Sequence, residues 1–277
     1  MSDNSLDLKF AKLQAIIRDL KRVAVAFSAG VDSTYLLKVA VDTLGADSVV
    51  AVTGKSDSLS QTEFEQSVEL ARSIGAEHVF IDTREFEDPN YLANPANRCY
   101  FCKTDLFKHV NAYAAEHGFN AVLTGVNHDD QSDWRPGIQA GHEQRVVAPL
   151  ADAGLTKNDI RILSQRAGLP THDKPASPCL SSRIQYGEQI TPEKLRQIDD
   201  SERFLRSLGF RECRVRHHGN LARIEVPADQ IERLCQAEMR IKVDAALRGY
   251  GYQYVTIDAR GFRSGSMNEV IAFGKRQ

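Results

Sequence analysis

The apolar residues in the first half of the chain follow two alternating patterns. Short runs rich in Val, Ile and Ala are typical of strands that are buried on both faces, and they occupy 23–27, 48–53, 78–81 and 121–124. Segments with helical spacing of their apolar residues lie before and between these runs, over 6–20, 34–44, 62–74 and 105–117. Strands that alternate with helices indicate βαβ units. We therefore expect an α/β fold, with a parallel sheet and helices on both of its faces.

A different pattern begins near Thr191. Thr191 and Pro192 have the residue types of an N-cap and a first helical position, and they open an expected helix that ends at Leu208. Two strands, a long helix and a further strand are then expected over 212–217, 221–226, 229–247 and 252–258. This order predicts a small α+β domain with a mixed or antiparallel sheet.

The region between these two patterns supplies the expected domain boundary. A short strand or extended link is expected over 146–150, followed by a helix over 157–167 that Thr156 caps. The proline-rich segment 174–187 comes next. Because such segments commonly join domains, the chain is predicted to divide into residues 1–187 and residues 188–277.

The turn after the first apolar run has the features of an anion site. The strand stops at Ser28, and a helix is expected to begin a few residues later. Backbone N–H groups and the helix dipole favour phosphate at such a place. Gly30 allows a positive φ or a close backbone approach, Ser28 and Ser33 offer hydroxyls, and Asp32 offers a carboxylate for Mg²⁺. The spacing matches neither a P-loop nor a dinucleotide fingerprint, and an ordinary capped turn is the alternative.

A second polar stretch, 125–137, follows the fourth apolar run. Ligands of parallel sheets bind at the carboxyl ends of the strands, which is also where Ser56 is expected. The stretch is therefore interpreted as another wall of a nucleotide site, in which Asp129 or Asp133 shares the metal. A solvated loop is the alternative interpretation.

Length and charge limit the classes of function. The 277 residues suit one large or two modest domains. Residues from 192 onward carry a net charge of +4 and the earlier residues −6, which suits an anionic small substrate and is too weak to favour nucleic acid. The chain has no run of 18 apolar residues and begins with polar, acidic residues, so neither a membrane span nor a secretory signal is expected. The expected location is the cytoplasm.

Five cysteines indicate metal or thiol chemistry. An odd number argues against a disulfide framework in a cytoplasmic protein. Cys99 and Cys102 form a C-x-x-C motif, and Cys179 stands before two serines and Arg183, which would favour its thiolate. A redox pair, a zinc site, a three-cysteine iron–sulfur site and unreactive buried cysteines all remain open at this stage. Cys213 and Cys235 are taken as structural.

Several motifs together resemble one family. They are Ser28–Ser33, Gly125–Gly137, Lys174–Gly187, Arg214–His217 and Gly261–Gly265. The first is similar to the S-G-G-x-D-S loop of PP-loop ATP pyrophosphatases (adenine nucleotide alpha hydrolase-like proteins), with Ala29 in place of a glycine. The whole set resembles the LarE family of ATP-dependent sulfur transferases, which build the nickel-pincer nucleotide cofactor of lactate racemase. The resemblance covers essentially the whole chain.

The resemblance implies a reaction. ATP would adenylylate a carboxylate of pyridinium-3,5-biscarboxylic acid mononucleotide, and sulfur would then displace AMP to leave a thiocarboxylate. Together with the strand-end argument, it gives these ATP-binding residues: Ser28, Gly30, Asp32, Ser33, Ser56, Asn127, Asp129, Asp133 and Arg135. The substrate-binding residues that it implies are Ser182, Arg183, Arg214, Arg216 and Arg263.

Two metal sites also follow from the resemblance. Asp32 would hold Mg²⁺ at the ATP phosphates. Glu202 and Glu225 match acidic positions that the family links to a divalent metal near the substrate. The third such position is not clear in this sequence; the basic residue Arg233 would fall on it, which departs from the family pattern.

The sulfur source is the last implication. Some family members sacrifice a single cysteine, and others use three cysteines to hold a [4Fe–4S] cluster whose open iron carries an extra sulfide. Cys99, Cys102 and Cys179 match the second type. We therefore predict a multi-turnover enzyme that is supplied by a sulfide donor. Family members also form homo-oligomers, so a trimer or a hexamer is expected.

The alternatives differ in substrate or in chemistry. A cluster-dependent tRNA thiolase shares the ATP loop and three cysteines, but it normally carries zinc-ribbon cysteines or a strongly basic RNA-binding part. A sacrificial sulfur transferase would use Cys179 alone. An amide-forming ligase similar to NAD synthetase would leave the cysteines idle, and a nucleotide-binding or thiol-sensing regulator would release no pyrophosphate.

Overall fold

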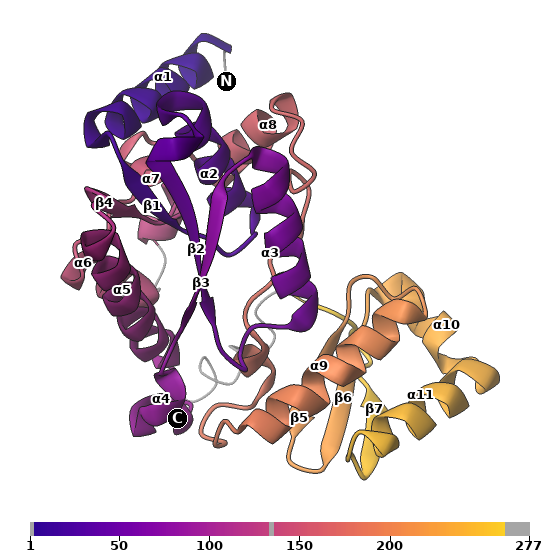
Figure 1. The fold of residues 1–277 in the computed structure, drawn as a ribbon. Coiled ribbons are helices and arrows are strands. Elements are labelled where there is room, and N and C mark those ends of the chain that lie inside the picture. The colour runs from indigo at the N-terminus through magenta and orange to yellow at the C-terminus, as the bar shows by residue number, and fades with distance from the viewer. Residues whose placement is uncertain (1–2, 133–135, 264–277) are drawn as a thin grey trace. The chain divides into compact units, whose positions relative to one another are not determined.

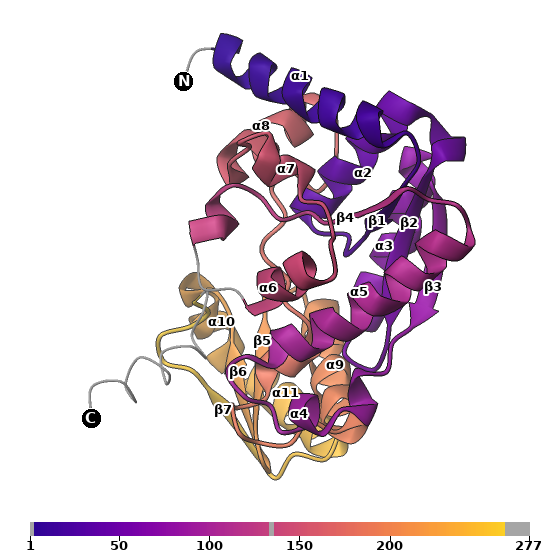
Figure 2. The ribbon, with the colours of Figure 1, turned by 90° about the vertical axis from the view of Figure 1, so that its left-hand side faces the viewer.

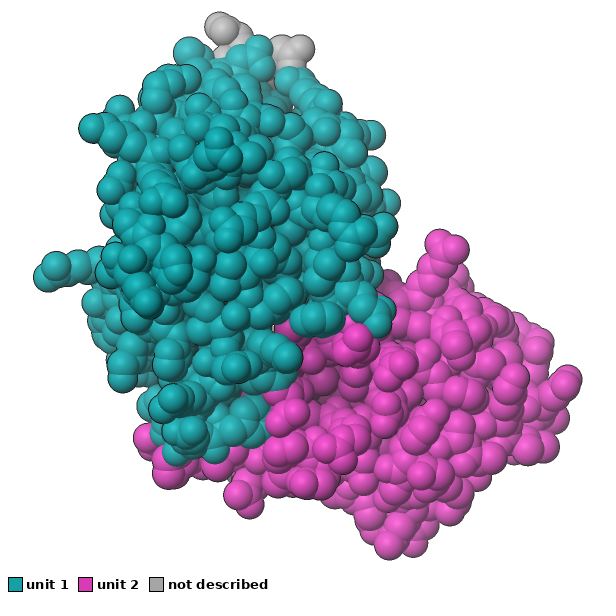
Figure 3. Space-filling view, in the orientation of Figure 1, with its two compact units in different colours: residues 1–56, 63–88, 97–177 teal, residues 57–62, 89–96, 178–277 magenta. Residues whose placement is uncertain are grey.

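The computed structural model describes residues 3–132 and 136–263. The chain forms two compact units, which are coloured separately in Figure 3. Unit 1 consists of residues 1–56, 63–88 and 97–177, and unit 2 consists of residues 57–62, 89–96 and 178–277. Among the described residues, none of the helices combines the length and the apolar character that crossing a bilayer requires.

Unit 1 is built on a four-stranded parallel sheet with the order β3-β2-β1-β4 (Figure 1). The strands are β1 Val23–Ala26, β2 Val49–Lys55, β3 Glu77–Asp82 and β4 Ala121–Leu123. Each lies on or within two residues of an apolar run in the sequence. Buried parallel strands are continuous apolar runs, and β1 and β2 are largely of this kind. β3 is an edge strand whose residues are half-buried or exposed, and the sequence located it by its short apolar run alone.

Helices cover both faces of this sheet, as predicted (Figures 1 and 2). Val23 and Val25 of β1 belong to one hydrophobic core, with residues of α1 Asp3–Leu20, α2 Val31–Leu44, α3 Gln61–Ile74 and α8 Lys157–Arg166. Ala24, which points to the opposite face, belongs to a second core with residues of α5 Arg98–Glu116. The two short helices α6 Pro136–Glu143 and α7 Pro149–Asp152 complete the unit.

Two helices begin earlier than the apolar spacing indicated. α2 begins at Val31 rather than Thr34, so Asp32 and Ser33 lie in its first turn. α5 begins at Arg98 rather than Asp105, so the C-x-x-C motif is helical. In both first turns a polar residue is buried, Ser33 in α2 and Arg98 in α5, so the apolar spacing does not mark the start of the helix. The segment 146–150, expected as a short strand or an extended link, forms a single bridge between Leu123 and Val147, and α7 then begins at Pro149.

Unit 2 has a mixed three-stranded sheet with the order β5-β6-β7. Its strands are β5 Arg214–His218, β6 Leu221–Glu225 and β7 Tyr254–Ile257, of which the first pair is antiparallel and the second parallel. Its helices are α4 Pro89–Leu92, α9 Pro192–Ser207, α10 Ile231–Cys235 and α11 Ala237–Gly249. The mixed α+β sheet is as predicted. The single long helix expected over 229–247 is wrong, because the extended backbone of Gln236 (ψ 139°) separates α10 from α11.

Unit 2 also takes in two short segments from the first half of the chain. The backbone N–H of Leu180 donates to the carbonyl of Ser58 at 3.0 Å, and Tyr91 Oη lies 2.7 Å from Ser181 Oγ. These long-range bonds attach residues 57–62 and 89–96 to the segment after 178. The last segment of unit 1 ends at Ser177, and the last segment of unit 2 begins at Pro178. The predicted domain boundary after Gly187 stays a prediction, since a compact unit is defined by contacts and a domain by independent folding.

Candidate active site

The turn between β1 and α2 presents the N-terminus of a buried helix. Gly30 is the N-cap residue and makes no side-chain cap. Ser28 Oγ lies 3.1 Å from Ser33 Oγ, which itself lies 3.3 Å from the carbonyl oxygen of Gly30. The two hydroxyls that the sequence singled out are therefore neighbours at the first turn of α2. N–H groups and the positive helix dipole at this turn favour an anion.

Ala29, not Gly30, has the left-handed backbone in this turn. The φ angle of Ala29 is +54° and its side chain is fully buried, whereas the φ of Gly30 is −81°. A Cβ at Gly30 would meet Ser28 Oγ at an ordinary 3.4 Å. Gly30 therefore does not supply a positive φ, and the close approach of its backbone to a ligand stays a prediction. The residue that departs from the usual glycine pattern bears the strained conformation, at a cost of roughly 1–2 kcal/mol.

Replacing Ala29 with glycine is expected to leave stability nearly unchanged. Glycine removes the strain of the positive φ but forfeits a buried methyl group worth about 0.8 kcal/mol and adds chain entropy in the unfolded state. A29G should therefore melt within a few degrees of the wild type and bind ATP at least as tightly, as measured by thermal unfolding and by calorimetry. Ala29→Val is the matched control, because a β-branched residue tolerates a positive φ poorly. If Ala29→Val has wild-type stability, the strain is not real.

Two predicted carboxylates meet at the N-terminus of α8. Lys157, the first residue of α8, places its Nζ 2.5 Å from Asp32 Oδ2, and its backbone N–H donates to Asp129 Oδ2 at 2.8 Å. Thr156 caps the helix through a reciprocal capping box with Asp159, as its residue type predicted. The structure therefore brings Asp129 and Asp32 to one lysine.

Asp32 retains an oxygen that suits a metal. Its Oδ1 is buried and has no hydrogen-bond partner among the described residues. An orphaned buried carboxylate oxygen beside a phosphate-sized turn fits Mg²⁺, which commonly takes one or two protein carboxylates and completes its shell with phosphates and water. Within residues 3–132 and 136–263, no three His, Cys, Asp or Glu side chains gather as a metal site.

The chain after β4 packs directly on this turn. A Cβ at Gly125 would lie 2.9 Å from the backbone nitrogen of Ser33 and 3.2 Å from the carbonyl carbon of Asp32. Asn127, two residues on, is 3% exposed, and its Oδ1 accepts from the N–H groups of Asp129 (3.0 Å) and Asp130 (3.2 Å). The Asn127 side chain thus shapes the loop that carries Asp129.

The remaining predicted ATP residues are separate or not described. Ser56 follows β2, and its Oγ lies 2.5 Å from Oε1 of Glu85, a side chain that is 2% exposed. This places Ser56 at the predicted sheet edge. Asp133 and Arg135 lie outside the residues that the structure describes.

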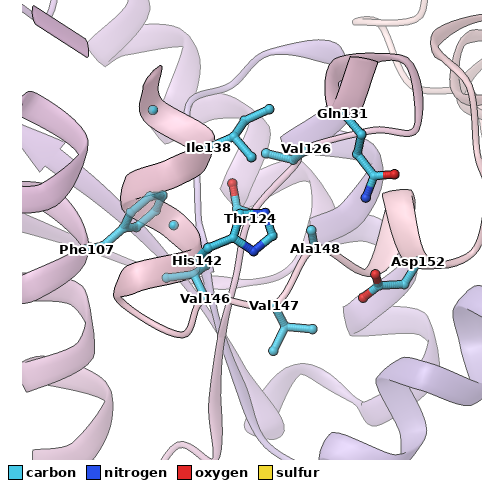
Figure 4. A pocket seen from close by; sticks show the side chains of 12 residues that line it. Phe107, Thr124, Val126, Gln131, Ile138, His142, Val146, Val147, Ala148 and Asp152 are labelled. Carbon is cyan, nitrogen blue, oxygen red and sulfur yellow. The ribbon is translucent and has the colours of Figure 1, made fainter. Parts of the chain in front are cut away.

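A small cavity lies beside the segment that follows β4 (Figure 4). It encloses about 170 Å³ between the end of β4, α5, α6 and α7. Thr124 and Val126 line it, while Gly125 between them approaches Ser33. Thr124 and Val126 therefore face the cavity, whereas Gly125 packs against the turn. His142, Gln131 and Asp152 supply polar groups to the cavity wall.

Sequence reasoning did not identify two lysines that contact the turn. The sequence indicated nothing about Lys157 except that it follows the predicted N-cap residue Thr156. Lys174 lies in a motif that was assigned to the family but not to ATP. Its Nζ donates to the carbonyl of Ala29 at 2.9 Å and to Gln66 Oε1 at 2.7 Å. Burial lowers the pKa of Lys174, because the charged form loses water.

In unit 2, the predicted substrate residue Arg183 lies in a buried ion pair. Arg183 Nε lies 2.9 Å from Glu202 Oε1, and the two residues are 2% and 0% exposed. The other end of its guanidinium contacts the carbonyl oxygens of Pro178 and Cys179 and the hydroxyl of Ser182. Arg183 therefore shapes the segment that carries Cys179.

Glu202 and Glu225, the predicted acidic metal positions, both face arginines. Glu202 also accepts from Arg206 at 2.7 Å and from the backbone N–H of Val215 at 3.1 Å. Glu225 Oε2 accepts two bonds from Arg216, at 2.8 and 3.0 Å. A divalent metal would have to displace these donors. The metal role of the two glutamates accordingly remains a prediction.

Three more of the predicted substrate residues, Arg214, Arg216 and Arg263, also lie in unit 2, and together with Arg183 they are called the arginine cluster below. Arg216 also donates to the carbonyl of Ser182 at 3.2 Å. The guanidinium carbon of Arg214 lies 5.1 Å from the ring centre of Phe262. Burial and the nearby Arg183 lower the pKa of Arg214. Arg263 donates to Asp258 at 3.2 Å. A cluster so rich in arginine suits an anionic group.

The predicted cluster cysteines are accessible but divided between the units. Cys99 is exposed and Cys102 half-buried, one turn apart at the start of α5 in unit 1. Cys179 is half-buried in unit 2, at the start of a 3₁₀ turn over Leu180–Arg183. Cys213 is buried, and burial raises its pKa to about 12. The expectation that Cys213 is a structural thiol agrees with this burial, and the three-cysteine grouping remains a prediction.

Comparison with known proteins gives full-length relatives. No protein-family model matches the chain. It is 39% identical over 267 residues to pyridinium-3,5-bisthiocarboxylic acid mononucleotide synthase of Lactiplantibacillus plantarum, which covers 96% of each chain. An uncharacterised protein of Synechocystis is 45% identical over 96% of this chain and 99% of its own. Argininosuccinate synthase of Haloarcula marismortui is 31% identical over 53% of this chain and 37% of its own.

Proposed function

The chain belongs to the LarE family, and from this premise we propose that it is an ATP-dependent sulfur transferase. Its proposed substrate is pyridinium-3,5-biscarboxylic acid mononucleotide, whose carboxylates become thiocarboxylates. The observation that carries the proposal is the 39% identity to the Lactiplantibacillus synthase, which extends over 96% of both chains and so includes unit 2 as well as the ATP turn.

The turn at the start of α2 suits the first half-reaction. A carboxylate oxygen of the substrate would attack the α-phosphorus of ATP, and pyrophosphate would leave. Free N–H groups of the first turn and the hydroxyls of Ser28 and Ser33 would offset the charge that develops on the pyrophosphate. Mg²⁺ on Asp32 would supply further positive charge there. The ATP-binding residues proposed are Ser28, Gly30, Asp32, Ser33, Ser56, Asn127, Asp129, Asp133 and Arg135.

The arginine cluster of unit 2 suits the acidic substrate. Arg214, Arg216 and Arg263 carry charge-assisted donors that match phosphate and carboxylate oxygens. Arg183 is proposed to act through the segment that it shapes, since its guanidinium already holds Glu202 and two backbone carbonyls. Ser182, which bonds to Arg183 at 2.9 Å, belongs to the same group.

The second half-reaction needs a sulfur nucleophile. A sulfide would attack the acyl carbon of the adenylate and expel AMP, so that a C–S bond replaces the C–O bond. The three accessible thiols Cys99, Cys102 and Cys179 suit iron as ligands. A [4Fe–4S] cluster on them would supply the sulfide from its open iron. The alternative is that the Cys179 sulfur is itself transferred.

Cys99→Ala separates the two sulfur sources. We expect anaerobically reconstituted wild-type protein to contain iron and acid-labile sulfide, and to form more than one thiocarboxylate per chain. Cys99→Ala should lose both the iron and the turnover, because the cluster loses a ligand. Exposed Cys235 offers the matched control, since Cys235→Ala should keep both. Full multi-turnover activity without iron in Cys99→Ala, or loss of the Cys179 sulfur by mass spectrometry after one turnover, would contradict the cluster.

A further inference from the structure

The ATP turn has no lysine of its own, and Lys174 brings one to it. Lys174 follows α8 and stands 145 positions after Ala29. Its ammonium donates to the carbonyl of Ala29 at 2.9 Å and to Gln66 Oε1 at 2.7 Å. Ala29 is the residue with the positive φ. Lys174 therefore holds the strained peptide of the turn.

The charge of Lys174 is incompletely compensated. The two bonds of its Nζ go to neutral oxygens, those of Ala29 and Gln66. The carboxylate of Glu63 acts on its charge through a Coulombic interaction. Burial lowers its pKa, so the free protein holds an ammonium that an added anion would stabilise. An ammonium has three N–H donors, and the two bonds to Ala29 and Gln66 leave one. Lys157 differs, since Asp32 already pairs with it.

We propose that Lys174 is a positioning residue with two successive partners: the Ala29 carbonyl in the free enzyme, and a β- or γ-phosphate oxygen when ATP is bound. In the first state it keeps the turn in its left-handed conformation. In the second it contributes the positive charge that a P-loop takes from within its own turn. The inference rests on ATP being the substrate, as proposed above.

Nucleotide affinities of charge variants test this. Lys174→Met keeps the length of the side chain and removes its charge, and Lys174→Arg keeps the charge. We expect Lys174→Met to bind ATP and pyrophosphate about 10- to 100-fold more weakly, the range for one charge-assisted hydrogen bond, while AMP affinity changes little. Lys174→Arg should recover part of the loss. Lys12→Met, exposed on α1, is the control and should bind ATP like the wild type.

A double variant separates phosphate contact from support of the turn. Glycine at position 29 adopts the positive φ without help. If Lys174 only holds the turn, adding Ala29→Gly to Lys174→Met should restore ATP binding, and the phosphate contact is overturned. If Lys174 contacts phosphate, the double variant should remain as weak as Lys174→Met. Equal losses for ATP and AMP would also overturn it. Wild-type protein that binds no ATP would instead contradict the proposed function itself.

Discussion

Gly125→Ala is expected to lower ATP-dependent activity about 100-fold while the protein stays folded. The added Cβ would lie 2.9 Å from the backbone nitrogen of Ser33 and 3.2 Å from the carbonyl carbon of Asp32. Real Cβ atoms do not come this close to backbone, and no side chain can rotate away to make room. Either the chain after β4 or the N-terminus of α2 must therefore move.

The displacement should affect binding more than stability. Overpacking of this kind costs roughly 1–3 kcal/mol, whereas a shift of about 1 Å in positioning groups can reduce a rate 100-fold. We expect G125A to melt several degrees below the wild type, to bind ATP at least about 10-fold more weakly, and to lose about 100-fold in pyrophosphate release. Calorimetry and a pyrophosphate assay measure the two effects.

Gly141→Ala provides the comparison for this variant. Gly141 lies in α6 of the same unit, and its added Cβ would meet Phe107 at an ordinary 3.5 Å. Alanine also favours helix over glycine. Gly141→Ala should therefore be neutral or slightly stabilising and should bind ATP normally. If Gly125→Ala binds ATP as tightly as Gly141→Ala does, contact between the chain after β4 and α2 does not shape the nucleotide site.

The central strands β1 and β2 of unit 1 were predictable because they are largely buried. Such strands are continuous apolar runs, and Val23–Ala26 and Val49–Lys55 stand out on that ground alone. Helix starts were predictable where a cap marks them, as Thr156 and Thr191 do. The start of α5 was missed, since Asn97 caps it without a side-chain hydrogen bond. Helix boundaries were therefore predictable from the sequence only where a capping side chain marks them.

The site was predictable in its location but not in its pairings. A turn after a buried strand identifies where an anion binds, because only the order of elements matters. The bond from Lys157 to Asp32 joins residues 125 positions apart, and nothing in the sequence indicates that these two side chains are in contact. Arg183 illustrates the same limit differently. Arginine suits a substrate phosphate and a buried carboxylate equally, and only the structure shows that Glu202 is its partner.

Glu202→Gln is expected to destabilise unit 2 by about 3–5 kcal/mol, the range for breaking a buried ion pair by removing one partner. The carboxylate is fully buried and accepts from Arg183, Arg206 and the backbone of Val215. Glutamine keeps the shape of the side chain but loses its charge. The two N–H donors of its amide would also face N–H groups from which the carboxylate now accepts. Arg183, 2% exposed, would then hold an uncompensated charge. Urea unfolding measures the difference.

The same carboxylate should make the wild type sensitive to acid. Burial acts to raise the pKa of Glu202, but Arg183 and the other arginines outweigh it and lower the pKa from 4.5 to about 2. Since the folded pKa lies below the unfolded one, the stabilisation is complete above pH 4.5 and is lost as the pH falls from 4.5 to 2. The loss amounts to roughly 3 kcal/mol. E202Q should lack this loss, so the two stability curves should converge as the pH falls.

Glu202→Gln also distinguishes a structural carboxylate from a metal ligand. If Glu202 chiefly neutralises Arg183, the variant should be unstable with or without divalent metal, and Glu193→Gln, an exposed first-turn residue of α9, should behave like the wild type. If Glu202 binds a metal as the family resemblance implies, E202Q should fold with nearly normal stability and lose the metal dependence of thiocarboxylate formation. Because four donors already surround the carboxylate, a metal could reach it only by displacing an arginine, and we expect the first result.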